Sequence, residues 1–171
     1  MIARKAKQKD VGAIARVHVI AWQACYRSLL PDEFLDSLSL TDRENLWSKV
    51  LDQPGHDLLV CRSERQTVGF AACGPSRDLD KDASAVAEVY AIYVLPDFWG
   101  QGYGHVLWRR AEKDRALAKF MELDVWVLAA NGRARKFYER QGCQEDPRAN
   151  KDAHLGGVKL PEVRYVKQLG C

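Results

Sequence analysis

Three glycines at a spacing of two mark the part of this chain that most clearly suggests chemistry. Gly100, Gly102 and Gly104 follow an apolar run and precede a helical pattern. Glycines at a helix entrance let the backbone bend tightly and bring its free N–H groups up to an anion. Such a turn can also be only a flexible corner. With the elements around it, it predicts a phosphate or pyrophosphate bound at the start of the helix.

The elements that position this turn run from Glu88 to Arg115. Residues 89–94 are mostly β-branched or aromatic and are apolar on both alternating faces, as a buried central strand requires. Pro96 ends the run, because proline has no N–H for a strand ladder. Beyond the turn, three apolar residues share one face of a helix, namely Val106, Leu107 and Ala111.

Two common phosphate-binding motifs do not fit this turn. The lysine and the hydroxyl of a P-loop are absent. A third glycine of a dinucleotide fingerprint would be sought at position 105, which is His105. A nucleotide-binding domain also needs a magnesium ligand or a lysine, and neither stands at the expected spacing.

A second segment, residues 129–143 (AANGRARKFYERQGC), ends another strand and forms another helix. Together with the strand that carries Glu88, it resembles the GNAT superfamily of acetyl-CoA-dependent N-acetyltransferases. The signature of that family, [QR]xxGxG[AG] after a strand ending in V-x-P, reads here as Trp99-Gly100-Gln101-Gly102-Tyr103-Gly104. Trp99 stands where Gln or Arg is usual. The resemblance covers nearly the whole chain and is most specific over residues 88–143.

The resemblance implies the GNAT fold, an α/β (α+β) domain. Its mixed, mostly antiparallel sheet has about seven strands, is flanked by about four helices and is splayed between the fourth and fifth strands. The pattern alone supports only a mixed α/β domain, and 171 residues suit one domain over 1–171. We expect strands at 2–9, 58–62, 67–73, 88–94, 122–128 and 158–169, and loops at 52–57, 75–84 and 147–157.

The helix boundaries follow from capping residues. We expect helices after Asp10, from Pro31 to about Leu38, and after Asn131 as far as Gly142. The sequence Thr41-Asp42-Arg43-Glu44 has the form of a capping box, and it predicts a helix with four inward-facing residues, Leu46, Trp47, Val50 and Leu51.

Acetyl transfer from a thioester to an amine requires an acceptor for the amine proton and a donor for the departing thiolate. The resemblance implies that Glu88 is the general base, directly or through water; the alternative is a sheet carboxylate that makes a salt bridge. It also implies that Tyr138, in the A-x-x-x-Y-x-x-x-G segment, donates its phenol to the coenzyme sulfur. The alternative for Tyr138 is a tyrosine packed under the sheet.

The resemblance further implies acetyl-CoA as co-substrate and no metal. The backbone N–H groups of Gln101, Gly102, Tyr103, Gly104 and His105 would hold the pyrophosphate, Tyr93 and Val94 would pair with the pantetheine like an added strand, and Asn131 would hydrogen-bond the same arm. Asn131 also suits a helix N-cap, and the two roles are compatible. Arg133 and Lys136 are candidates for the 3′-phosphate, or else they are solvated.

The acceptor would be a small-molecule amine or a protein N-terminus. Its pocket is expected between the helices of residues 22–38 and the loop 147–157. Trp22, Tyr26 and Trp47 wall this pocket unless they belong to the core, and the carboxylates of the loop 75–84 are solvated unless they bind the acceptor. His18 is expected to be a core or cleft-wall residue rather than a catalyst.

Composition sets outer limits on function. The chain is 47% hydrophobic, and its 26 basic and 23 acidic residues give a net charge of +3. No polybasic segment indicates nucleic acid, whereas a basic bias suits a polyanionic ligand. Five scattered cysteines without CxxC spacing argue against zinc and are consistent with a reducing cytoplasm, with Cys61 and Cys73 in the core. No apolar run is long enough to predict a membrane span.

Two alternatives of other classes stay open, as does the oligomeric state. A degenerate relative could bind an acyl-CoA as a sensor or structural partner without turnover, and a nucleotide-binding domain could use the glycine turn. We expect a homodimer if the terminal strand, residues 158–169 followed by Cys171, is an exposed edge.

Overall fold

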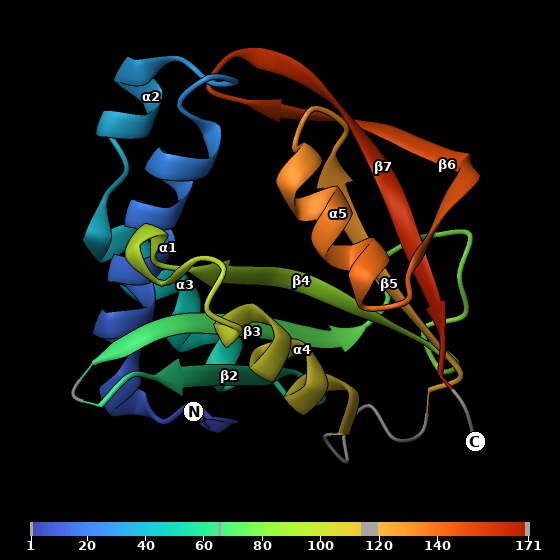
Figure 1. The fold of residues 1–171 in the computed structure, drawn as a ribbon, viewed down its shortest axis with the longest axis horizontal. Helices are drawn as coiled ribbons and strands as arrows, with labels where there is room; N and C mark the ends of the chain where they lie inside the picture. Colours follow the sequence, from blue (N-terminus) through green and yellow to red (C-terminus); the bar gives the residue numbers. More distant parts are fainter. Residues whose placement is uncertain (1, 65, 114–119, 170–171) are drawn as a thin grey trace.

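The computed structural model describes residues 2–64, 66–113 and 120–169 (Figure 1). In this part of the chain, five α-helices flank a seven-stranded mixed sheet of order β1-β2-β3-β4-β5-β7-β6. The helices are α1 (Val11–Tyr26), α2 (Asp32–Asp36), α3 (Leu40–Leu51), α4 (Tyr103–Lys113) and α5 (Gly132–Arg140). The strands are β1 (Ile2–Lys5), β2 (Asp57–Arg62), β3 (Thr67–Pro75), β4 (Val86–Val94), β5 (Glu122–Leu128), β6 (Gln144–Leu155) and β7 (Val158–Gln168). Within the described residues, no helix has the length and apolar character needed to span a bilayer.

The two faces of the sheet are covered by different helices, as Figure 1 shows. One core lies beneath α4 and α5 and contains Leu107, Trp108 and Val125, together with the buried Cys61 and Cys73. A second core lies on the opposite face, where α1 and α3 pack on β2 and β3 through Ile14, Trp47 and Phe70. A third cluster joins α1 and α2 to the far end of the β6–β7 hairpin.

The sheet opens between β4 and β5, which confirms the expected splay between the fourth and fifth strands. These parallel strands pair over only three positions, Val86–Glu88 with Glu122–Asp124. Beyond Glu88, β4 continues along β3 to Val94, whereas β5 continues along β7 to Leu128. Among the strands that the structure describes, none pairs with residues 89–94 of β4 on the side of the opening.

The expectation of a loop at 147–157 is wrong, because β6 extends through Leu155 and pairs with β7. The two strands turn at Gly156 and Gly157, whose φ angles are 55° and 77°. Such angles suit a two-residue hairpin turn. The chain bulges between Glu145 and Asn150, so that Pro147 does not have to donate to the ladder. Consequently β6, and not the last strand β7, forms this edge of the sheet.

The start of α3 differs from the expected one, whereas α1 begins directly after Asp10 as expected but without a capping hydrogen bond from the Asp10 side chain. The N-cap of α3 is Ser39, whose hydroxyl accepts the Asp42 N–H at 3.1 Å, and Leu46 is 39% exposed rather than inward-facing. Asp10 does precede α1, but its carboxylate accepts the N–H of Lys7 and two hydrogen bonds from Arg4.

Other local predictions are confirmed. Asn131 is the N-cap of α5, because its side chain accepts the Ala134 N–H at 3.1 Å. Gly142 follows the end of this helix with a φ of 85°. The strands expected at 58–62 and 67–73 also form, and they pair as the antiparallel hairpin of β2 and β3. Arg115 and Cys171, which bounded two of the expectations, lie outside the described residues.

Candidate active site

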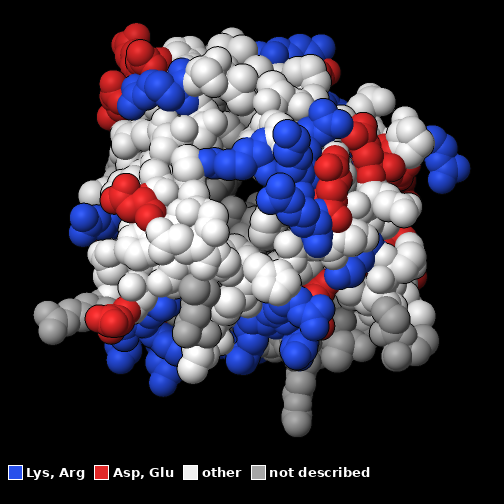
Figure 2. Space-filling view, viewed as in Figure 1, with Lys and Arg blue, Asp and Glu red and all other residues white. Residues whose placement is uncertain are grey.

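A cavity of about 880 Å³ occupies the opening in the sheet. On the α4 and α5 face it is lined by Gly102, Gly104 and Tyr138, and on the α1 face by Trp22 and Tyr26. The cleft side of β4 lines it from Glu88 to Val94. In Figure 2 a hollow lies near the middle of the molecule with basic side chains beside it. The cavity therefore connects the two faces of the sheet.

The glycine turn delivers unpaired backbone donors to this cavity. Gly100 and Gly102 have φ angles of 73° and 87°, which non-glycine residues rarely adopt. Helix α4 starts at Tyr103, and its first backbone hydrogen bond at this end runs from Val106 N–H to Gly102 O. The backbone N–H groups of residues 100–105 donate no hydrogen bond to any described group. The start of α4 is thus suited to bind an anion, and Arg140 lines the same cavity.

The absence of a side chain matters at Gly104 for a different structural reason than at Gly102. A Cβ on Gly102 would meet no described atom within 4 Å, so within the protein only the backbone conformation constrains that position. A Cβ on Gly104 would lie 3.2 Å from the ring of Phe137 on α5. The absence of a side chain at Gly104 therefore allows α4 and α5 to approach each other.

Trp99 occupies the signature position at which the GNAT pattern usually has Gln or Arg. Its indole N–H donates to the Val94 carbonyl at 2.7 Å, and the Arg133 guanidinium lies 3.2 Å from the centre of an indole ring. Arg133 also donates to Cys25 Sγ at 2.9 Å, which links α5 to α1. Arg133 is thus already engaged at one side of the cavity, while Lys136 is exposed.

Of the backbone groups expected to bind pantetheine, those of Tyr93 and Val94 lie at the cavity wall. The carbonyl of Val94 already accepts a hydrogen bond from the Trp99 indole. The Tyr93 hydroxyl lies 3.2 Å from that of Tyr26. Asn131 also lines the cavity. His105 lies there with its Nδ1 2.8 Å from Gln141 Oε1, whereas Gln101 is outside the lining and its side chain donates to Asp97 O.

Tyr138 lines the cavity from α5 and is 6% exposed. Its ring packs against Trp108 and Tyr165, so its position is fixed by the core. Among the described residues, none hydrogen-bonds the Tyr138 hydroxyl. Burial raises the pKa of this phenol, and the hydroxyl therefore keeps its proton at neutral pH. The arrangement leaves a protonated hydroxyl available to a ligand.

Glu88 is buried at the point where the strands separate, with 1% of its surface exposed. Arg77 donates three hydrogen bonds to its carboxylate, from the backbone N–H at 3.0 Å, from Nε at 3.0 Å and from Nη2 at 2.5 Å. The salt bridge considered as an alternative is therefore present. Glu88 nevertheless lines the cavity, so the ion pair and contact with a ligand are compatible.

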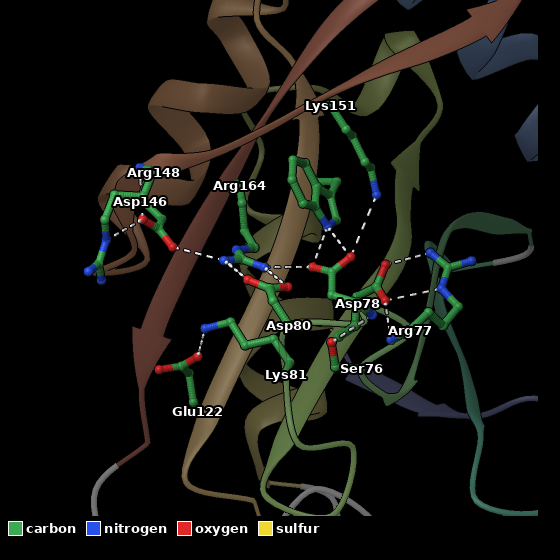
Figure 3. Close-up of polar contacts among 12 residues, drawn as sticks. Ser76, Arg77, Asp78, Asp80, Lys81, Glu122, Asp146, Arg148, Lys151 and Arg164 are labelled. Carbon is green, nitrogen blue, oxygen red and sulfur yellow. Dashed lines mark hydrogen bonds and ion pairs between the residues drawn. The ribbon is translucent and has the colours of Figure 1, made fainter.

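The loop between β3 and β4 is not simply solvated, as Figure 3 shows. Asp78 accepts the indole N–H of Trp126 and, like Asp80, pairs with the buried guanidinium of Arg164. Asp146 on β6 completes this set at 2.9 Å. The loop that carries Arg77 is thus tied to the half of the sheet beyond the opening, and it positions Arg77 beside Glu88.

The acceptor side of the cavity agrees in part with expectation. Trp22 and Tyr26 line it, and the residues expected in a loop contribute Lys151, Ala153 and Leu155 from β6. Trp47 does not; it lies in the core and donates to Nδ1 of His18 at 3.0 Å. Burial lowers the pKa of His18 to about 3, which makes it a neutral core residue.

Several lining residues were missed from the sequence, among them Arg77, Trp126 and Glu162. A signal for two of them exists. Trp126 lies two residues beyond Asp124 on β5, and Glu162 lies two residues before Arg164 on β7, so polar and aromatic residues recur on one face of apolar strands. Arg77 has no such signal, because it lies in a loop.

The chain is similar in sequence to known N-acetyltransferases. The sequence model described as "Acetyltransferase (GNAT) family" matches residues 17–143. An uncharacterized N-acetyltransferase of Bacillus subtilis, YuaI, is 31% identical over 161 residues, covering 94% of this chain and 88% of the relative. A probable N-acetyltransferase of Mycobacterium tuberculosis, Rv2775, is 26% identical and covers 95% of this chain and 90% of its own.

Solved structures share the fold. The ribosomal-protein-alanine N-acetyltransferase of Brucella melitensis superposes with a TM-score of 0.77 at 23% identity, covering 99% of this chain and 100% of its own. The putative acetyltransferase yncA of Salmonella typhimurium, solved with acetyl-CoA, superposes with a TM-score of 0.75 at 20% identity. The match covers 99% of this chain and 94% of that one. The PaiA N-acetyltransferase of Thermoplasma acidophilum, solved with coenzyme A, gives 0.71 at 18% identity and covers 97% of each chain.

Proposed function

Because this chain belongs to the acetyltransferase (GNAT) family, we propose that it transfers the acetyl group of acetyl-CoA to a primary amine by direct attack in a ternary complex. The observation that carries the proposal is the set of unpaired N–H groups of residues 100–105 at the start of α4, beside a cavity that crosses the sheet. Such a site binds a pyrophosphate on one face and admits an amine from the other.

The coenzyme is held by backbone more than by side chains. The N–H groups from Gln101 to His105 bind its pyrophosphate, with Arg140 nearby as a cation that lacks a described carboxylate partner. No described strand pairs with residues 89–94 of β4 on this side, so Tyr93 and Val94 can pair with the pantetheine amides. Asn131 faces the same arm while it caps α5.

The proton transfers use Tyr138 and Glu88. Tyr138 gives its phenolic proton to the departing thiolate, a role that its unpaired and protonated hydroxyl supports. Glu88 receives the proton that the amine loses, directly or through a bound water. The ammonium gives one proton to Glu88, which later releases it to solvent. The amine–acyl adduct gives its second proton to Tyr138, which replaces the proton that Tyr138 passed to the thiolate.

Two classes of acceptor amine fit this proposal. The Brucella neighbour is named a ribosomal-protein-alanine N-acetyltransferase, which supports a protein N-terminus, and the aromatic wall that Trp22 and Tyr26 form in the cavity supports a small amine.

A thiol-release assay with acetyl-CoA and a panel of amines tests the function. Turnover with at least one amine is expected, together with acetyl-CoA binding in calorimetry. Binding without thiol release for any amine, including N-terminal peptides, would instead favour an acyl-CoA sensor. Binding of ATP in competition with coenzyme A, at similar affinity, would favour a nucleotide-binding domain.

A further inference from the structure

Glu162 lies on the wall of the cavity opposite the coenzyme-binding face. It is a β7 residue that stands beside Leu128 of β5 and Lys151 of β6 in the ladder. Side chains alternate along a strand, so Glu162 shares a face with Leu160 and Arg164. Leu160 packs toward α1 and α2, and Arg164 reaches the loop that carries Asp78. Glu162 therefore points toward the α1 side of the sheet, away from α5.

The other charged side chains at this end of the cavity have partners of opposite charge. Arg77 pairs with Glu88 at 2.5 Å, and Lys151 lies 3.8 Å from Asp78. Lys151 also lies 3.9 Å from the centre of a Trp126 ring. Glu162, by contrast, has neither a hydrogen bond nor an ion pair with any residue that the structure describes. This end of the cavity thus holds one carboxylate that no described side chain contacts through a hydrogen bond or an ion pair, although the charges of Lys151 and Arg77 act on it from a greater distance.

The surroundings of Glu162 favour a cation over water alone. Trp22, Tyr26 and Trp126 line the same end, and aromatic faces attract cations. Trp22 and Tyr26 meet edge to face at 5.2 Å, which gives this wall a fixed shape. Burial raises the pKa of Glu162, whereas Lys151 lowers it and Glu88 raises it further. A partly buried carboxylate of this kind gains most from a bound positive charge.

We propose that Glu162 is the counter-ion of the acceptor amine, and that it selects primary amines carried on an apolar or aromatic body with no acid group beside the amine. The inference rests on the proposed function and adds the substrate class. A free amino acid is disfavoured, because its carboxylate would stand beside Glu162 while Arg77 and Lys151 already have partners. The ammonium would be held at Glu162 before its proton passes to Glu88.

A matched pair of ligands tests the selection. Phenethylamine and phenylalanine differ only by the carboxylate beside the amine, and each is titrated by calorimetry into the protein saturated with coenzyme A. Phenethylamine should bind at least about tenfold more tightly than phenylalanine, which corresponds to roughly 1.4 kcal/mol. Equal binding, preference for phenylalanine, or no binding of phenethylamine would overturn the proposal.

Variants of Glu162 separate its role from general structure. Glu162→Gln should weaken phenethylamine binding about tenfold and raise its KM, with the Kd of acetyl-CoA unchanged, and Glu162→Asp should restore part of the affinity. The control is Asp152→Asn on β6, which removes a carboxylate that pairs with Lys159 outside the cavity lining. It should leave amine binding unchanged. If Glu162→Gln binds the amine normally while acetyl-CoA still binds and turns over, only this inference fails; if acetyl-CoA does not bind, the proposed function itself fails.

Discussion

Glu88 on β4 and Asp124 on β5 stand opposite each other in the last residue pair that joins the two halves of the sheet, and both are buried. Arg77 neutralises Glu88, whereas neither oxygen of Asp124 is hydrogen-bonded to a described residue. The opening thus starts at two buried acids, of which one is paired and faces the cavity.

Glu88→Gln should lower kcat by about a hundredfold with little change in the KM of acetyl-CoA, because it removes a proton acceptor but not a coenzyme contact. The pH dependence of kcat should also change. Arg77→Met serves as the comparison, since it removes the partner of the carboxylate and leaves the carboxylate in place. If Glu88 only anchors the loop, both variants should lose equal activity and keep the wild-type pH profile, and the base assignment would then be withdrawn.

Tyr138→Phe should lower kcat by about ten- to a hundredfold without destabilising the protein, because the hydroxyl makes no hydrogen bond to a described residue. Burial raises the pKa of this phenol, so it stays protonated throughout an assay range up to about pH 10. The basic side of the pH–rate profile should therefore have the same shape in both proteins and differ only in height. Thermal unfolding provides the control, and an unchanged kcat would contradict the role.

Asp124→Asn should stabilise the protein at alkaline pH. Burial raises the pKa of Asp124 to about 7, well above that of an unfolded aspartate. The folded state therefore holds a proton that the unfolded state releases, and the free energy of unfolding falls as pH rises from about 4 to about 7. In the asparagine variant the free energy of unfolding does not fall in this way; the fall in the wild type amounts to at most about 4 kcal/mol. Urea unfolding of both proteins at acid and alkaline pH measures it; parallel pH dependences would refute the account.

Local patterns predicted the parts of the site that lie close together in sequence. The strand, turn and helix around Gly102, the Asn131 cap and the Gly142 stop all follow from neighbouring residues. The same reasoning grouped Gly104 with Gly102, although Gly104 serves the contact with Phe137. Contacts between helices are not encoded in glycine spacing, so the sequence could not separate the two.

Features that depend on distant residues were not predictable from the sequence. β6 is polar and contains Pro147, and it becomes a strand because β7 offers a ladder and two glycines make the turn. Arg164 forms ion pairs with carboxylates of the β3–β4 loop and of β6, two segments that lie far apart in the chain. No periodic pattern in the sequence indicates that these carboxylates meet at one arginine. The sequence therefore suggested that the carboxylates of the β3–β4 loop are solvated. Because β6 covers β7, the expected pairing of two copies through β7 loses its basis, and the homodimer stays a prediction.

The binding of the coenzyme pyrophosphate by the glycine turn is tested most directly by Gly102→Ala. A Cβ at this position, with its φ of 87°, opposes the conformation that aims the N–H groups and occupies space next to them. Gly55→Ala is the matched control, since Gly55 has a φ of 79° and also meets no atom within 4 Å, but lies outside the cavity lining. Gln101→Ala is a second control, because only its N–H is used.

The decisive measurement is the Kd of acetyl-CoA by calorimetry for these variants, with thermal unfolding as a check that each is folded. The account predicts that Gly102→Ala raises this Kd at least about tenfold, roughly 1.4 kcal/mol, while Gly55→Ala and Gln101→Ala stay at the wild-type value. A folded Gly102→Ala protein that binds acetyl-CoA as tightly as the wild type would contradict it.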